Sequence, residues 1–234
     1  MKWNVPPLWE GDSCWIIGGG TSVPEQFGVP ENIIKKVCER RMEPCAYSSY
    51  MKAIHNKHII GINNAYTIGK WMDILFFGDH DWYLTHRQKV AIWPGLKITC
   101  NPRFANKSKC DLEGIKFMAR DSKHREGIST EPGCVSWNRN SGAAAISLAY
   151  HLGVKTVYLL GFDMTLGSQA FSHWHGSHVP DGKKARKAPP FMTHLLAFPA
   201  IATDAERLGV KIYNVSPESK IDVFEKVSLK EVLG

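Results

Sequence analysis

The sequence predicts an α/β fold in which a mostly parallel sheet is covered by helices on both faces. Short, continuously apolar segments alternate with helical patterns, and the apolar segments end at glycine or polar residues. Strands that are apolar at successive positions are typical of parallel sheets buried on both sides. The 234 residues contain no linker rich in proline, glycine or serine and no block of like charges, so we expect a single domain over residues 1–234.

The first half of the chain predicts four strands and one helix. An apolar run at residues 13–17 stops at three glycines, and residues 31–42 follow a helical pattern. Residues 58–62 form the second predicted strand, which ends at two asparagines. The third and fourth predicted strands are residues 73–77 and 96–100, and the third ends at a glycine and an aspartate.

The second half contains the clearest pairing of a helix with a strand. Residues 141–153 form a helix of small residues that is closed by glycine, and residues 156–161 form the strand that follows. Residues 191–208 are again helical, and residues 210–215 form a last strand. A helix and a strand within so few residues indicate the crossover units of an α/β fold.

The composition is that of a globular chain with an anionic partner. With 44% hydrophobic and 22% charged residues, intrinsic disorder is excluded as the main state. Twenty-nine Lys and Arg against 22 Asp and Glu leave a net charge of +7, which favours a nucleotide, a nucleic acid or a phosphorylated glycan. The six cysteines form no CxxC pair, and no segment has the apolar length of a signal peptide or a membrane span. We therefore expect a cytoplasmic protein with reduced thiols.

Candidate binding residues follow the predicted strands, because ligands of open parallel sheets bind beyond the carboxyl ends of the strands. Residues 18–22, called the glycine turn here, allow a phosphate to approach the backbone closely. Their spacing matches neither a dinucleotide-binding loop nor an ATPase loop, and an ordinary strand-to-helix turn is an equal alternative. The predicted nucleotide-binding residues are Gly18, Gly19, Gly20, Thr21, Ser22, Asn63, Asn64, Ser141, Gly142 and Asp163.

The later members of this set each have a structural alternative. Asn63 and Asn64 offer donors and acceptors to a ribose or a base edge, or serve as turn residues. At the start of a helix, Ser141 and Gly142 could present a hydroxyl and uncompensated amides to an anion, or have a packing role only. Asp163 is either a ligand to a bound sugar or nucleotide or a local turn cap.

Two polar segments are candidates for chemistry. Residues 79–81 read Asp-His-Asp after a strand, a pattern that can hold Mg²⁺ or Mn²⁺ against a nucleotide diphosphate. Asp79 alone could equally orient a hydroxyl or amino group. Residues 173–178 place three histidines in a polar loop, without a nearby cysteine or acid to complete a zinc site, so we favour an acid or base role. Four cations in residues 181–187 could bind phosphates or lie in solvent, and we expect a lid or insert at about residues 165–192.

An ordered set of motifs runs through most of the chain. They lie in residues 16–22, at Asn63, and in residues 140–142, 157–163, 172–178 and 211–217. This set resembles the bacterial lipooligosaccharide sialyltransferase family and a group of related phage-encoded proteins. The resemblance implies a single Rossmann-like domain with a lid, and a nucleotide-activated sugar bound over the glycine turn. It also implies that Asn63, Ser141 and Gly142 hold the nucleotide, that His178 is the general base, and that no metal or other cofactor is required.

The sequence departs from the family pattern at three places. Gly19 stands where the family has a small polar residue, Thr21 where it has proline, and Thr165 near an expected tyrosine. These departures leave the donor sugar open. The segment after His178 is longer than in the family, which makes His194 a competing base.

We expect a glycosyltransferase that moves a sugar from a nucleotide-activated donor to a hydroxyl acceptor. The predicted catalytic residues are His178, His175, Asp79 and His194. The acceptor is either a hydroxymethylated base of phage DNA, which the basic charge and eight tryptophans favour, or a glycan. The alternatives are a pterin-type pyrophosphokinase with magnesium on Asp79 and Asp81, and a non-catalytic nucleotide- or DNA-binding accessory protein of phage.

Overall fold

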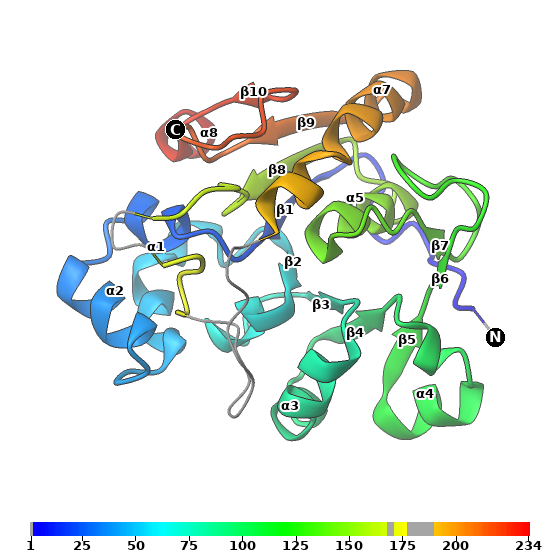
Figure 1. Cartoon of the computed structure of the whole chain (residues 1–234), viewed down its shortest axis with the longest axis horizontal. Coiled ribbons are helices and arrows are strands. Elements are labelled where there is room, and N and C mark those ends of the chain that lie inside the picture. Colours follow the sequence, from blue (N-terminus) through cyan, green and yellow to red (C-terminus); the bar gives the residue numbers. More distant parts are fainter. Residues whose placement is uncertain (1, 168–170, 177–189) are drawn as a thin grey trace.

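The main sheet has eight strands and is parallel throughout. The computed structural model describes residues 2–167, 171–176 and 190–234, without the side chain of Lys107. Within these residues the strands follow the spatial order β10-β9-β8-β1-β2-β3-β4-β5, and each neighbouring pair is parallel (Figure 1). The strands are β1 (Ser13–Ile17), β2 (His58–Ile62), β3 (Ile74–Phe77), β4 (Leu96–Thr99), β5 (Ile115–Phe117), β8 (Thr156–Leu160), β9 (Lys211–Asn214) and β10 (Glu225–Lys226).

Helices connect these strands, and a second small sheet lies beside helix α5. The helices are α1 (Ser22–Gln26), α2 (Glu31–Cys38), α3 (His80–Ala91), α4 (Lys107–Glu113), α5 (Ser141–His151), α6 (Phe191–Leu195), α7 (Phe198–Leu208) and α8 (Leu229–Leu233). Short 3-10 helices span Pro44–Tyr50, Lys52–Ile54, Asn63–Thr67 and Pro102–Phe104. The small sheet pairs β6 (Ala119–Arg120) with β7 (Cys134–Val135) in parallel.

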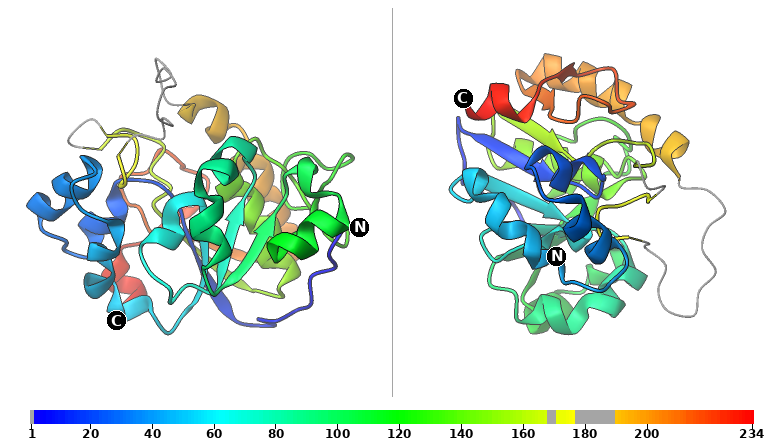
Figure 2. Two further views of the ribbon diagram at one scale, coloured as in Figure 1. Left: turned by 90° about the horizontal axis from the view of Figure 1, so that it is seen from below. Right: turned by 90° about the vertical axis from the view of Figure 1, so that its left-hand side faces the viewer.

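Successive side chains of each central strand enter two different hydrophobic cores. In β1, Ile16 packs in the core that contains α5 and α7, whereas Trp15 and Ile17 pack in the core on the other face. In β3, Phe76 and Phe77 divide in the same way. Side chains of a strand point alternately to opposite faces, so these apolar runs need helices on both faces (Figure 2).

The order of the strands reverses between β1 and β8. From β1 the chain builds outward through β2, β3, β4 and β5, and it then returns to β8 on the other side of β1. At such a switch point the connections leave in opposite directions and open a crevice beyond the carboxyl ends of the strands. The glycine turn and Asp163 follow β1 and β8, so both lie at this switch point.

The predicted fold class is confirmed, and the bounds of two predicted helices are corrected. The helix predicted over residues 31–42 ends at Cys38, because the chain turns there and Arg40 takes a left-handed φ of 57°. The helix predicted over residues 191–208 is divided into α6 and α7, since Pro199 stands in the first turn of α7 and supplies no amide to a preceding turn. Strand β10 follows the segment predicted as the last strand. Among the described residues, no helix combines the length and apolarity that crossing a bilayer requires.

Candidate functional site

The amides of the glycine turn are largely engaged by the protein itself. The Gly18 and Gly20 amides donate to the carbonyls of Leu160 and Gly161, both at 2.8 Å, and the Ser22 amide donates to Asp163 Oδ2 at 2.9 Å. Three of the five amides of the turn are therefore not available to an anion. The amides of Gly19 and Thr21 have no acceptor within the described part of the chain.

Asp163 anchors the start of α1 to the end of β8. Its buried carboxylate accepts from the Ser22 hydroxyl at 2.5 Å as well as from the Ser22 amide, and the two residues are 141 positions apart. A β-carbon added at Gly20 would lie 2.5 Å from Asp163 Cγ and 2.7 Å from the Gly161 carbonyl oxygen. The close approach of the two strand ends thus requires glycine at this position. A contact of Asp163 with a ligand stays a prediction.

Trp174 holds the histidine-containing segment against the glycine turn. Its side chain is fully buried, its Nε1 donates to the Gly18 carbonyl at 2.9 Å, and its amide donates to the Gly19 carbonyl at 3.0 Å. The Trp174 carbonyl in turn accepts from the Tyr47 hydroxyl at 3.0 Å. His173 lies over Gly19, where an added β-carbon would come within 2.5 Å of its ring. The segment is therefore a packed cover of the turn, with a tryptophan anchor that the sequence analysis did not identify.

His175 is placed beside Asn64, which follows β2. The ring of His175 is 8% exposed and stacks on His173 with ring centres 5.1 Å apart. The Asn64 Oδ1 accepts from Trp82 Nε1 at 2.6 Å, and the Asn64 Nδ2 lies 3.4 Å from His175 Nδ1. Because indole nitrogen is only a donor, this amide orientation makes Nδ1 of His175 the acceptor, and a neutral His175 carries its proton on Nε2.

Asn63 combines backbone strain with an unsatisfied acceptor. Its φ is 49°, and its Oδ1 is buried with no donor among the described residues. A buried acceptor without a donor costs about 1–3 kcal/mol, which a bound hydroxyl or amino group can recover. This geometry suits the predicted contact with a ribose or a base edge.

The Gly142 amide at the start of α5 has an acceptor within the protein, whereas we expected the amides at this helix start to lack one. Asn140 caps the helix, and its Oδ1 accepts from the Gly142 amide at 2.8 Å and the Ala143 amide at 3.3 Å. The Gly142 amide is thus already paired, so the predicted anion contact would depend on the Ser141 hydroxyl and amide. Gly142 has a packing role, since an added β-carbon would lie 2.8 Å from the Phe162 ring.

Asp79 caps a helix that the sequence analysis did not predict. Its Oδ1 accepts from the Trp82 amide at 2.9 Å at the start of α3, and this helix carries the Trp82 indole that orients Asn64. The described residues contain no group of three His, Cys, Asp or Glu side chains that could hold a metal ion. The roles proposed for Asp79 in binding a metal or substrate stay predictions.

The remaining catalytic candidates fall in or near the predicted lid. His194 lies in α6. His178 lies outside the described residues, as does most of the predicted lid, of which residues 165–167, 171–176 and 190–192 are described. The structure brings together the glycine turn, Asp163, Asn64 and His175, while the choice of the base stays a prediction.

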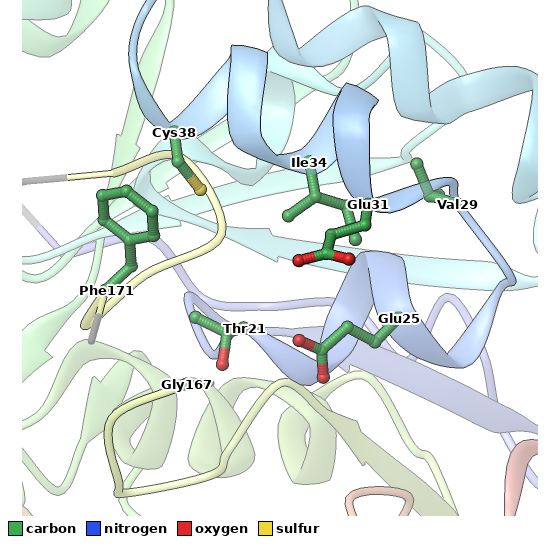
Figure 3. A pocket seen from close by; sticks show the side chains of 8 residues that line it. All are labelled: Thr21, Glu25, Val29, Glu31, Ile34, Cys38, Gly167 and Phe171. Atoms are coloured by element: carbon green, nitrogen blue, oxygen red, sulfur yellow. The ribbon is translucent and has the colours of Figure 1, made fainter. Parts of the chain in front are cut away.

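A cavity of about 280 Å³ adjoins the glycine turn on the side of α1 and α2 (Figure 3). Its lining residues are Thr21, Glu25, Val29, Glu31, Ile34, Cys38, Gly167 and Phe171. The carboxylates of Glu25 and Glu31 point into the same space (Figure 3). Partial burial, followed by the charge of Asp163, raises the pKa of Glu25. Two carboxylates favour hydroxyl or ammonium groups over phosphate, and neither glutamate was singled out from the sequence.

Comparison with solved structures shows a similarity of fold. No protein-family model matches the chain, and no curated protein matches it. The structure is similar to that of the MAf glycosyltransferase from Magnetospirillum magneticum AMB-1, with a TM-score of 0.56 and 14% sequence identity. The match covers 97% of this chain and 36% of that chain, so this chain spans about a third of the length of that glycosyltransferase. The chain thus has an α/β fold that is also found in a solved glycosyltransferase.

Proposed function

We propose that the protein is a glycosyltransferase that moves a sugar from a nucleotide-activated donor to a hydroxyl acceptor. The observation that carries the proposal is the composition of the crevice at the switch point. In the described residues the amides of Gly19 and Thr21 have no acceptor and the Oδ1 of Asn63 has no donor, and all three residues follow β1 or β2. The ring of His175 belongs to the segment that covers these strand ends. The similarity to a solved glycosyltransferase supports this reading of the crevice.

In the proposed reaction the acceptor oxygen attacks the anomeric carbon of the donor sugar. The bond from that carbon to the phosphate oxygen breaks, and the nucleotide leaves with the electron pair while a histidine takes the acceptor proton. The Asn64 amide donates toward Nδ1 of His175, so this lone pair is not available to take the proton of the acceptor. We therefore assign the base role to His178, with His194 as the alternative.

The donor sugar is proposed to face the cavity beside α1 and α2. Its hydroxyl or amino groups would meet Glu25 and Glu31, while the phosphate would contact the glycine turn, of which Thr21 also lines this cavity. This arrangement separates the charged leaving group from the transferred sugar. It favours a donor sugar that is neutral or carries an amino group.

A thermal-shift panel of CMP, UDP, GDP and ATP and their sugar conjugates, with and without magnesium, tests the proposal. A donor at one hundred times its Kd stabilises by about 2.7 kcal/mol, and 1 kcal/mol raises Tm by about 2–4 °C in a chain of this size. We expect a rise of roughly 5–11 °C with one nucleotide sugar, unchanged by a chelator. A rise only with ATP and magnesium favours the pyrophosphokinase.

Replacement of the candidate histidines distinguishes an enzyme from a binding protein. We expect His178→Ala to abolish release of free nucleotide from the donor while the thermal shift persists. A shift in the wild type without any turnover on glycan or DNA acceptors would favour the accessory-protein alternative. Salt-dependent binding of duplex DNA would favour DNA over an uncharged glycan as the acceptor.

A further inference from the structure

A second cavity, of about 380 Å³, lies at the carboxyl ends of β3 and β4. It is lined by Arg120, Asp121, Ser122, Arg125, Glu126, Trp137, Asn138 and Arg139. Its position follows from Arg120, which donates from Nε to the Cys100 carbonyl at 3.0 Å and from Nη2 to the Gly78 carbonyl at 3.1 Å. Gly78 follows β3 and Cys100 follows β4, so this cavity opens at the same edge of the sheet as the glycine turn. We call it the arginine cavity.

Three guanidinium groups line the arginine cavity, and among the described residues none of them is paired with a carboxylate. The Arg120 guanidinium stacks on the Trp137 ring at 3.7 Å and donates to two backbone carbonyls. In the described part of the chain, neither Arg125 nor Arg139 forms an ion pair or a side-chain hydrogen bond. The Asn138 amide donates to the Arg125 carbonyl at 3.0 Å, which ties the two arginine-bearing segments together. The fold therefore gathers three positive charges around one hollow.

The acidic residues Asp121 and Glu126 of the lining set two negative charges against the three guanidiniums and leave a net charge of +1, and in the described residues neither carboxylate forms an ion pair with these arginines. Burial alone would raise the pKa of Asp121, but hydrogen bonds from Ser129, His124 and Lys123 outweigh it and hold the pKa below its usual value. Asp121 accepts from the Ser129 hydroxyl at 2.6 Å and from two amides of its own loop, so its oxygens are occupied. Glu126 is exposed and forms no ion pair with the arginines.

We propose that the arginine cavity binds the oxyanion group of a small anionic sugar, a phosphate ester or a carboxylate. A guanidinium pairs with either group through two parallel hydrogen bonds, and the fixed Arg120–Trp137 stack provides a rigid floor. The concave shape and volume suit one sugar-sized group. Duplex DNA instead needs an extended cationic track along its backbone.

The arginine cavity is placed to hold the acceptor, an assignment that rests on the proposed function. Strands β3 and β4 lie two and three positions from β1 in the sheet, and these strand spacings amount to about 10–15 Å. A short glycan held by a terminal anionic group at this distance can present a hydroxyl to the switch-point crevice. The proposed acceptor is therefore an acidic or phosphorylated glycan.

Calorimetric titration of the full chain tests the oxyanion site without any donor. The probes are glucose 6-phosphate, glucuronate, inorganic phosphate and glucose, and the variants are Arg125→Gln and Arg139→Gln. We expect at least one sugar anion to bind, glucose not to bind, and each variant to weaken binding roughly tenfold. Both arginines are exposed and make no structural side-chain bonds in the described residues, so the variants should fold.

The matched control is Arg41→Gln, which removes an equal charge from an exposed arginine paired with Glu39. It should leave the affinity unchanged within twofold.

Binding of glucose 6-phosphate alone assigns a phosphate ester, and binding of glucuronate alone assigns a carboxylate. Equal binding of glucose, full affinity in both arginine variants, or displacement of the sugar anion by duplex DNA would overturn the inference. If no nucleotide sugar binds but the sugar anion does, only the proposed function fails.

Discussion

The hydrogen bond from Trp174 to the glycine turn provides the sharpest test of how the site is built. Trp174→Phe keeps an aromatic ring but removes Nε1, which donates to the Gly18 carbonyl at 2.9 Å. Gly18 and Trp174 are both buried, so the Gly18 carbonyl would lose its donor without gaining a hydrogen bond from water. Leaving a buried acceptor unsatisfied costs about 1–3 kcal/mol, in addition to the packing lost with the smaller ring.

Trp93→Phe is the matched control because it removes the same ring atoms without breaking a hydrogen bond. Trp93 is 4% exposed, and its Nε1 is buried with no partner among the described residues. The difference between the two variants therefore reports the change in hydrogen bonding, since Trp174→Phe leaves an acceptor without its donor whereas Trp93→Phe removes an unsatisfied donor. At about 2–4 °C per kcal/mol, Trp174→Phe should melt roughly 2–12 °C below Trp93→Phe.

Urea unfolding of both variants, followed by tryptophan fluorescence and circular dichroism, measures the difference in free energy of unfolding that underlies the difference in Tm. We expect a lower midpoint for Trp174→Phe at an unchanged slope. The same variant should also bind the donor more weakly, since the Gly18 carbonyl shapes the turn that holds the phosphate. Equal losses of stability in the two variants would refute the view that this bond holds the cover on the turn.

Three further predictions address the turn, the acid response and the orientation of Asn64. Gly20→Ala should cost about 1–3 kcal/mol of unfolding free energy in urea unfolding, because the added β-carbon meets the Gly161 backbone oxygen at 2.7 Å. Gly19→Ala should cost less, because its β-carbon meets the His173 ring, which is a side chain that can move. Equal costs in the two variants would contradict this. Burial would raise the pKa of Asp204, but hydrogen bonds from Arg207, the Ile128 amide and His124 lower it overall. The contribution of Asp204 to the free energy of unfolding should therefore be complete above the unfolded pKa of about 3.9 and be lost as the pH drops through the lower folded pKa. In Asp204→Asn, urea unfolding at several pH values should show a smaller loss of stability at acid pH. An unchanged acid slope in that variant would be inconsistent with the assignment. Trp82→Phe removes the 2.6 Å bond to Asn64 and should weaken nucleotide-sugar binding by thermal shift while circular dichroism stays native, and full binding would argue against a positioning role.

The central strands could be predicted from the sequence because their burial is local in origin. Residues 13–17 and 58–62 are apolar at nearly every position and end at glycine or asparagine, and they coincide with β1 and β2. A strand that is covered by helices on both faces of the sheet is apolar at successive positions, whichever strands lie next to it. Helix α3 was missed because its polar and aromatic residues show little helical periodicity, and its start depends on the cap by Asp79.

The sequence by itself determined the fold class and which residues follow the strands. Only the tertiary structure decided what those residues do, because their partners are distant in the chain. Asp163 meets Ser22 across 141 positions, and Trp174 meets Gly18 across 156 positions. The three arginines of the arginine cavity share a polar, aperiodic stretch of sequence that indicates only a loop. They become a site because Arg120 is fixed on the ends of β3 and β4, where the parallel sheet brings its strand ends to one edge.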